Sequence, residues 1–154
     1  MVGQKADVYL NLLGEGIPVI DGTIEFILGL PHDFPVGIAS AAMGAEIDFI
    51  LQRIGLRNRF CAVTSAEDVT RSKPDPESFL TTLGRLTRLL PGLIPSQVLV
   101  IEDSFKGVAA ARNAGMRTIA LTTSYPMEML TEADLIVEGL SGWSLEKVEQ
   151  ALDV

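Results

Sequence analysis

The sequence has little from which a disulfide, a metal cluster or a nucleic-acid surface could be built. It contains one cysteine and one histidine in 154 residues, which excludes an internal disulfide and a His/Cys metal site. A lone cysteine also suits a reducing compartment. Its 12 basic residues are outnumbered by 20 acidic ones, giving a formal net charge of −8, whereas nucleic-acid binding needs a basic face. We therefore expect no nucleic-acid partner.

Long hydrophobic runs are absent as well, although 47% of the residues are hydrophobic and the mean hydropathy is +0.32. No run reaches the roughly 20 residues needed to span a bilayer. Lys5 and Asp7 interrupt the start of the chain, where a signal peptide would need a continuous apolar segment. The apolar content therefore predicts one core domain, residues 1–154, with no membrane contact, and the lone cysteine favours the cytoplasm.

Short apolar runs alternate with segments of helical period along most of the chain. This alternation predicts an α/β fold, a three-layer, Rossmann-like, mostly parallel sheet with helices on both faces. Strands are expected at 34–39, 60–64, 98–101, 118–122 and 135–137, and helices at 6–13, 23–30, 45–54, 76–90, 108–116 and 145–152.

The first of three polar strand ends is Ser40-Ala41, which follows the strand ending at Ala39. In an open parallel sheet, ligands gather at the carboxyl ends of the strands. A hydroxyl and the backbone N–H groups after it would suit a phosphate at the start of the next helix. The alternative is that Ser40 is only an N-cap serine.

The second is Lys73, which lies in the loop before the helix expected from Pro76. Asp75 suits the cap and Pro76 the first helical position, so Lys73 would project from a stiff loop. There, its ammonium group would neutralise a transferring phosphoryl group. The alternative is an ordinary solvated lysine.

The third is the adjacent pair Glu102-Asp103, at the end of a buried strand. Mg²⁺ takes one or two carboxylates besides water and phosphate oxygens. We expect Asp103 to be the direct ligand and Glu102 to hold either a metal-bound water or the ammonium group of Lys73. The alternative is that both acids cap the helix that starts near Lys106.

Three segments carry these residues in a recognisable order: Gly37-Ile-Ala-Ser40-Ala, then Ser72-Lys-Pro-Asp-Pro-Glu-Ser-Phe79, then Ile101-Glu-Asp-Ser-Phe-Lys-Gly-Val-Ala-Ala-Ala-Arg-Asn-Ala-Gly-Met116. They resemble three motifs of the haloacid dehalogenase superfamily, and the match is closest to its phosphatase and β-phosphoglucomutase-like branch. The likeness extends over nearly the whole chain.

The resemblance implies an Mg²⁺-dependent phosphohydrolase that acts on a small phosphate monoester, such as a phosphorylated metabolite. By this resemblance, Ser40 and the Ala41 amide bind phosphate, and Lys73 steadies both the phosphate and the nucleophile. Asp103, together with Glu102, binds Mg²⁺.

The first motif of that family, an apolar strand followed by Asp-x-Asp-Gly-Thr, has no good match. The one similar stretch, Val19-Ile-Asp-Gly-Thr23, has valine at the place of the nucleophilic aspartate. Only 19 positions separate Asp21 from Ser40, which leaves no room for a cap domain. We expect Asp21 to cap a helix rather than act in a capless enzyme, and residues 1–16 to be the remnant of a helix returning from the cap.

By the same resemblance, the missing strand is the central one, between the strands that end at Ser40 and Glu102. Three outcomes stay open: these two strands pair directly, a second chain or copy supplies a strand, or the domain is only marginally stable. We expect no activity from the chain alone. The alternative is a non-catalytic phosphate- or metal-binding or regulatory domain. Cys61 is expected to be a buried small hydrophobe, and Ser124, on the site side of the sheet, has no assigned role.

Overall fold

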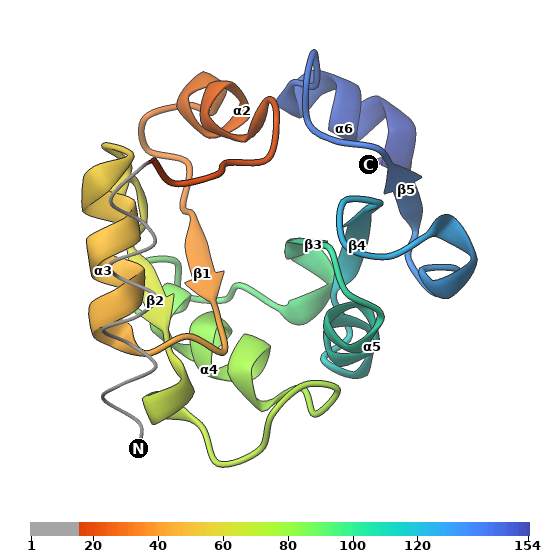
Figure 1. Cartoon of the computed structure of the whole chain (residues 1–154). Coiled ribbons are helices and arrows are strands. Elements are labelled where there is room, and N and C mark those ends of the chain that lie inside the picture. The colour runs from red at the N-terminus through yellow and green to blue at the C-terminus, as the bar shows by residue number, and fades with distance from the viewer. Residues whose placement is uncertain (1–15) are drawn as a thin grey trace.

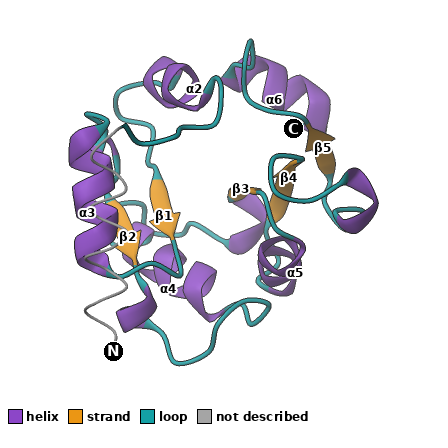
Figure 2. Cartoon of the chain, viewed as in Figure 1, coloured by secondary structure: helices purple, strands orange, loops and turns teal. Residues whose placement is uncertain are grey.

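Parallel strands and helices alternate through residues 16–154, the part of the chain that the computed structural model describes (Figures 1 and 2). The expected helix at 6–13 and most of the proposed cap remnant at 1–16 lie outside these residues. The strands are β1 (Gly37–Ala39), β2 (Ala62–Thr64), β3 (Leu99–Glu102), β4 (Arg117–Leu121) and β5 (Leu135–Val137). The helices are α2 (Thr23–Gly29), α3 (Gly44–Arg53), α4 (Glu77–Leu86), α5 (Phe105–Asn113) and α6 (Leu145–Leu152), with short 3-10 turns η2 (Arg57–Arg59), η3 (Ala66–Asp68), η4 (Pro95–Gln97) and η5 (Met127–Met129).

The strands form two parallel sheets instead of the one sheet expected. In the first, β1 pairs with β2, and Gly37 lies opposite Ala62. In the second, the order is β3-β4-β5, with Leu99 opposite Arg117 and Ile119 opposite Leu135. Among the described strands, β1 and β3 do not pair. The first of the three open outcomes, direct pairing of these two strands, is therefore wrong.

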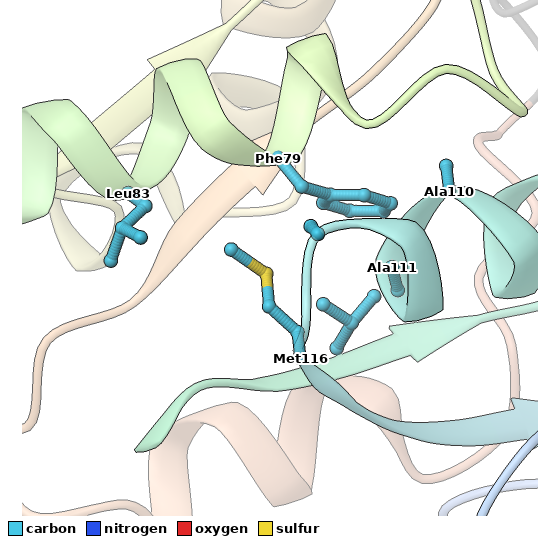
Figure 3. Close-up of a cluster of buried hydrophobic side chains, with 7 residues drawn as sticks. Phe79, Leu83, Ala110, Ala111 and Met116 are labelled. Carbon is cyan, nitrogen blue, oxygen red and sulfur yellow. The ribbon is translucent and has the colours of Figure 1, made fainter. Parts of the chain in front are cut away.

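Helices cover both faces of these strands, as the sequence predicts. On one face, α4 and α5 pack on β3, and Figure 3 shows Phe79, Leu83 and Met116 in this layer. On the other face, Phe26 of α2 and Val148 of α6 pack with Ile119 of β4. Both layers are apolar, which explains why the strands carry nearly continuous hydrophobic runs.

Helix α5 begins at Phe105, three residues earlier than the expected Val108, and ends at Asn113. Ser104 is its N-cap, and its Oγ accepts a hydrogen bond from Gly107 N at 3.0 Å. The serine that follows the two acids, rather than the acids themselves, therefore fixes the start of this helix.

Two further expectations are wrong. Asp21 does not cap α2, because the N-cap is Gly22 with φ 80°, and a Cβ there would lie 2.2 Å from Ser141 N. A glycine is required at this close approach. Cys61 is exposed rather than buried, because β2 begins only at Ala62.

None of the helices in residues 16–154 is both long and apolar enough to cross a bilayer.

Candidate active site

Lys73 lies where the carboxyl ends of the two sheets approach each other. Its Nζ donates to the carbonyl oxygen of Ala39, the last residue of β1, at 3.3 Å. It also contacts Oε1 of Glu102, the last residue of β3, in a short ion pair. The two side chains are only 19% and 10% exposed. One ammonium group therefore joins the ends of both sheets in a largely desolvated place.

The ammonium group of Lys73 lies over an aromatic ring. Its Nζ lies 4.6 Å from the centroid of the Phe79 ring in α4, a distance at which the ring face attracts a cation. Phe79 itself is buried in the cluster between α4 and α5. The position of the ammonium group is therefore set by the packed core and not by the loop alone.

The loop that presents Lys73 is closed by Glu77, the first residue of α4. Its carboxylate accepts hydrogen bonds from the backbone N–H groups of Thr70 and Arg71, each at 2.9 Å. The Thr70 amide, followed by contacts with Arg71, lowers the pKa of Glu77 from 4.5 to about 2. Asp75 accepts from Glu77 N at 3.0 Å. An ionised Glu77 therefore fixes the loop at neutral pH.

Glu102 is anchored on its other side by the turn into α5. Its Oε2 accepts from the Asp103 and Ser104 amides at 3.2 and 3.3 Å, and from Ser104 Oγ at 3.1 Å. A Cβ on Gly107 would lie 2.0 Å from Glu102 Cδ. The Glu102 carboxylate therefore fits in this place only because residue 107 has no side chain. Sequence analysis offered two partners for Glu102, a metal-bound water or the ammonium group of Lys73. In the structure Glu102 pairs with Lys73.

Asp103 points toward a residue that the sequence analysis left without a role. Ser124 Oγ, after the end of β4, donates to Asp103 Oδ2 at 2.5 Å. The signal that would have found Ser124 is its position, because it follows a strand end as Ser40 and Asp103 do. Its hydroxyl orients the carboxylate that we expected to be the direct metal ligand.

Ser40 begins the loop between β1 and α3. Its N–H donates to Thr64 O of β2 at 2.9 Å, and its Oγ accepts from Ala42 N at 3.1 Å. The N-cap of α3 is Met43, so the interpretation of Ser40 as an N-cap serine is wrong. The hydroxyl instead orders a turn that carries the exposed Ala41.

Asp21 is not part of this constellation. It precedes α2, and its carbonyl oxygen accepts from Leu140 N at 3.2 Å. Figure 1 shows α2 near the beginning of β1, away from the arrowhead at which Ser40 follows. A catalytic role for Asp21 in a capless enzyme has no support in this placement.

The donor set suits Mg²⁺ only in part. The residues from 16 to 154 contain no group of three or more His, Cys, Asp or Glu side chains that would hold a metal. Mg²⁺ needs only one or two carboxylates when waters and a phosphate complete its shell. Asp103 provides one such ligand, and Glu102 is already engaged by Lys73. The residues thus fit a magnesium site that is short of protein ligands.

The fold and these strand ends define a Rossmann-like α/β core with cationic, hydroxyl and carboxylate groups at one sheet edge. A family model described as haloacid dehalogenase-like hydrolase matches residues 5–121. The chain belongs to this family.

Known relatives include phosphatases. The chain is 32% identical over 123 residues to the validoxylamine A 7'-phosphate phosphatase of Streptomyces hygroscopicus subsp. limoneus, a match that covers 79% of this chain and 55% of the relative. It is 34% identical over 114 residues to the N-acetylmuramic acid 6-phosphate phosphatase of Pseudomonas aeruginosa, covering 72% and 45%. The chain thus spans about half the length of the curated relatives it matches.

Solved structures confirm the fold. The β-phosphoglucomutase of Clostridium difficile superposes with a TM-score of 0.84 at 22% identity, covering 98% of this chain and 65% of that one. A haloacid dehalogenase-like protein of Agrobacterium tumefaciens gives 0.78 at 30% identity, covering 99% and 70%. The expected α/β fold of the haloacid dehalogenase core is therefore confirmed.

Proposed function

We propose that this chain carries the phosphate- and metal-binding part of a phosphatase that hydrolyses a small phosphate monoester with Mg²⁺. The observation that carries the proposal is Lys73, whose ammonium group joins Ala39 O to Glu102 between Ser40 and Asp103. The phosphatases among the relatives support it. The substrate would be a small phosphorylated metabolite in the cytoplasm.

Each residue has a proposed task. The Ser40 hydroxyl and the Ala41 amide would hold phosphate oxygens, and Lys73 would neutralise their charge. Asp103 would hold Mg²⁺ directly, with Glu102 steadying Lys73 and the ligands around the ion. When bound, Mg²⁺ supplies charge neutralisation for the phosphoryl group. Ser124 would keep the Asp103 carboxylate oriented toward the ion.

We further propose that residues 1–154 form one core domain that does not turn over substrate alone. The stretch Val19-Ile-Asp-Gly-Thr23 lacks a carboxylate at the position that the resemblance assigns to the nucleophile. A non-catalytic phosphate-binding domain is the second candidate, which the same missing carboxylate favours.

Binding and turnover separate these possibilities. Inorganic phosphate and MgCl₂ titrated into the full chain should shift the amide NMR signals of residues 40–42, 73 and 103. Ser40→Ala should weaken the phosphate response and Asp103→Asn the magnesium response. The matched control is Asp48→Asn in α3, where Asp48 forms a half-buried ion pair with Arg57 of η2, and it should change neither response. Shifts that are absent, or equally reduced by the control, would count against the proposal.

The assay of p-nitrophenyl phosphate hydrolysis completes the test. The full chain with Mg²⁺ should give no rate above the rate without protein. A rate that disappears in Asp103→Asn would show that the chain has its own nucleophile, which contradicts the proposed lack of turnover.

A further inference from the structure

The turn from β1 into α3, residues 40–44, is held by the segment that follows β2. Ser40 N donates to Thr64 O at 2.9 Å, and Ala66 N donates to Ala42 O at 3.0 Å. These backbone hydrogen bonds continue the parallel pairing of β1 with β2 beyond the ends of both strands. They engage residues 40 and 42 and leave Ala41, between them, exposed.

The far end of this turn is held by a side chain. Glu67, the middle residue of η3, accepts through its Oε2 from Gly44 N, the first residue of α3, at 2.9 Å. Figure 1 shows the start of α3 beside the arrowhead of β2. Glu46 in turn accepts from Met43 N at 2.9 Å. Carboxylates therefore already occupy two N–H groups at the start of α3 that would otherwise be open to an anion.

Asp68 fixes the 3-10 turn that presents Glu67. Its Oδ2 accepts from Ser65 N at 2.7 Å and from Ser65 Oγ at 2.9 Å, and its Oδ1 accepts from Arg85 Nη2 at 2.6 Å. Arg85, in α4, also donates to Val63 O of β2. Hydrogen bonds from Arg85 and then from Ser65 hold the pKa of Asp68 well below its usual range, so it is ionised at neutral pH. Both β2 and α4 thus anchor the turn that carries Glu67.

We propose that Glu67 is a positioning residue for phosphate, and that it acts by fixing the turn 40–44 through its hydrogen bond with Gly44 N. The inference rests on the proposed function, in which the Ser40 hydroxyl and the Ala41 amide bind phosphate. A carboxylate repels an anion, so Glu67 supports binding only by keeping the turn in shape. Because it occupies the Gly44 N–H, it also confines the phosphate to the donors of residues 40 and 41.

Two substitutions at one position separate the hydrogen bond from the charge. Glu67→Gln removes the charge and keeps an oxygen that accepts from Gly44 N, whereas Glu67→Ala removes both. Glu128→Ala is the matched control, because Glu128 is the exposed middle residue of η5, another three-residue 3-10 turn. All three variants are compared with the unaltered full chain.

Amide hydrogen exchange without any ligand measures the hold on the turn. In Glu67→Ala, the Gly44 amide should exchange about fivefold faster than in the parent or more, since it loses its acceptor. In Glu67→Gln and Glu128→Ala its rate should stay within about twofold of the parent. The Thr118 amide of β4, which donates to Asp134, should keep its rate in every variant and so reports an intact fold.

Titration with inorganic phosphate, and separately with MgCl₂, measures the consequence for binding. The NMR signals of the Ala41 and Asp103 amides follow the two ligands. Glu67→Ala should raise the Kd for phosphate about fivefold or more, and Glu67→Gln and Glu128→Ala should bind phosphate no more weakly than the parent. The Kd for Mg²⁺ should stay within about twofold in every variant. A general loss of stability would weaken both ligands, so this split is specific to the turn.

The outcomes distinguish the positioning role from the proposed function. A parent chain that does not respond to phosphate would overturn both. If the parent binds phosphate and Glu67→Ala binds it equally well, the positioning role alone is overturned. The same holds if Glu67→Gln is as weak as Glu67→Ala, because the effect would then come from the charge, or if Glu67→Ala weakens Mg²⁺ binding to the same extent. Phosphate binding that is lost in Glu67→Ala and kept in Glu67→Gln, with Mg²⁺ binding unchanged, would support it.

Discussion

The region around β4 and the region around β1 contain the same kinds of elements but differ in completeness. β4 lies between β3 and β5, and four of its five residues are buried. β1 has a strand on one side only, and all three of its residues are half-buried. Local sequence does not cause this difference, since both strands carry an Ile-Ala pair, which is half-buried in β1 and buried in β4. It arises because a strand is buried only when its neighbours are present.

The candidate site lies at the boundary between these two regions. Ser40 and Lys73 come from the β1–β2 side, and Glu102, Asp103 and Ser124 from the β3–β4–β5 side. The Lys73–Glu102 pair is a direct polar link between them, beside the hydrogen bond from Asn113 Nδ2 to Pro74 O. The geometry of the site therefore depends on how firmly the two regions are held together. The following substitutions measure the stability of each region and of the contact between them.

The largest effect is expected in the complete region. Ile119→Ala in β4, where the side chain is fully buried, should lower the free energy of unfolding by about 2–5 kcal/mol. Ile38→Ala, the same change in the half-buried β1, should cost about 1–2 kcal/mol. Urea unfolding followed by circular dichroism measures both. Equal losses would show that β1 is as well packed as β4.

Breaking the link between the regions should come next. Lys73→Met keeps a side chain of similar length but leaves the Glu102 carboxylate, 10% exposed, without its cation. We expect a loss of about 1–3 kcal/mol in urea unfolding and a faster exchange of the Ser104 amide. Lys106→Met, at an exposed position, is the control and should stay within about 0.5 kcal/mol. If Lys73→Met is as stable as this control, the Lys73–Glu102 pair does not hold the two regions together.

The order of the elements was predictable because it depends on local patterns. The last strand and helix lie at 135–137 and 145–152, as expected, and the other helices and strands predicted within residues 16–154 lie within a few residues of their expected places. The predicted start of α5 is three residues too late because the prediction does not use Ser104 as the N-cap. The division into two sheets was not predictable in the same way, since pairing joins residues far apart in sequence.

The candidate site was predictable to the extent that it follows from topology. Parallel strands bring Ser40 and Glu102 to the same edge, and the loop before α4 brings Lys73 to them. Two contacts were missed for a physical reason. The acceptor for Lys73 on β1 is the backbone carbonyl of Ala39, which no side-chain pattern reveals, and Ser124 meets Asp103 only through the fold.

A glycine pair sharpens the comparison further. In Gly107→Ala, the new Cβ would meet the carboxylate of Glu102, and we expect a loss of about 1–3 kcal/mol from this overpacking. Gly84→Ala is the matched change in α4, where nothing lies within 4 Å of the new Cβ. It should raise stability by about 0.5–1 kcal/mol. Opposite signs in thermal unfolding would confirm that the turn after β3 is closed around Glu102, and equal signs would contradict it.

The smallest expected effect is the change in stability at acidic pH. Within residues 16–154, the two carboxyl groups with clearly lowered pKa values are Asp68 and Glu77, and both belong to the β1–β2 side. A hydrogen bond from Arg85, followed by one from the Ser65 amide, holds the pKa of Asp68 well below its usual range. For Glu77 the value falls from 4.5 to about 2, chiefly through the Thr70 amide.

The sign of the pH dependence follows from these shifts. A carboxyl whose pKa is lower in the folded chain binds fewer protons there, so its stabilising contribution is complete above pH 4.5 and is lost as the pH falls toward 2. Glu77→Gln should therefore be less stable than the parent at pH 6, and the difference should shrink through this window. Because these groups lie on one side, amides of β1 and β2 should lose exchange protection at a higher pH than those of β4. Simultaneous loss in all three strands would mean that the two regions unfold as one unit, even without a strand between them.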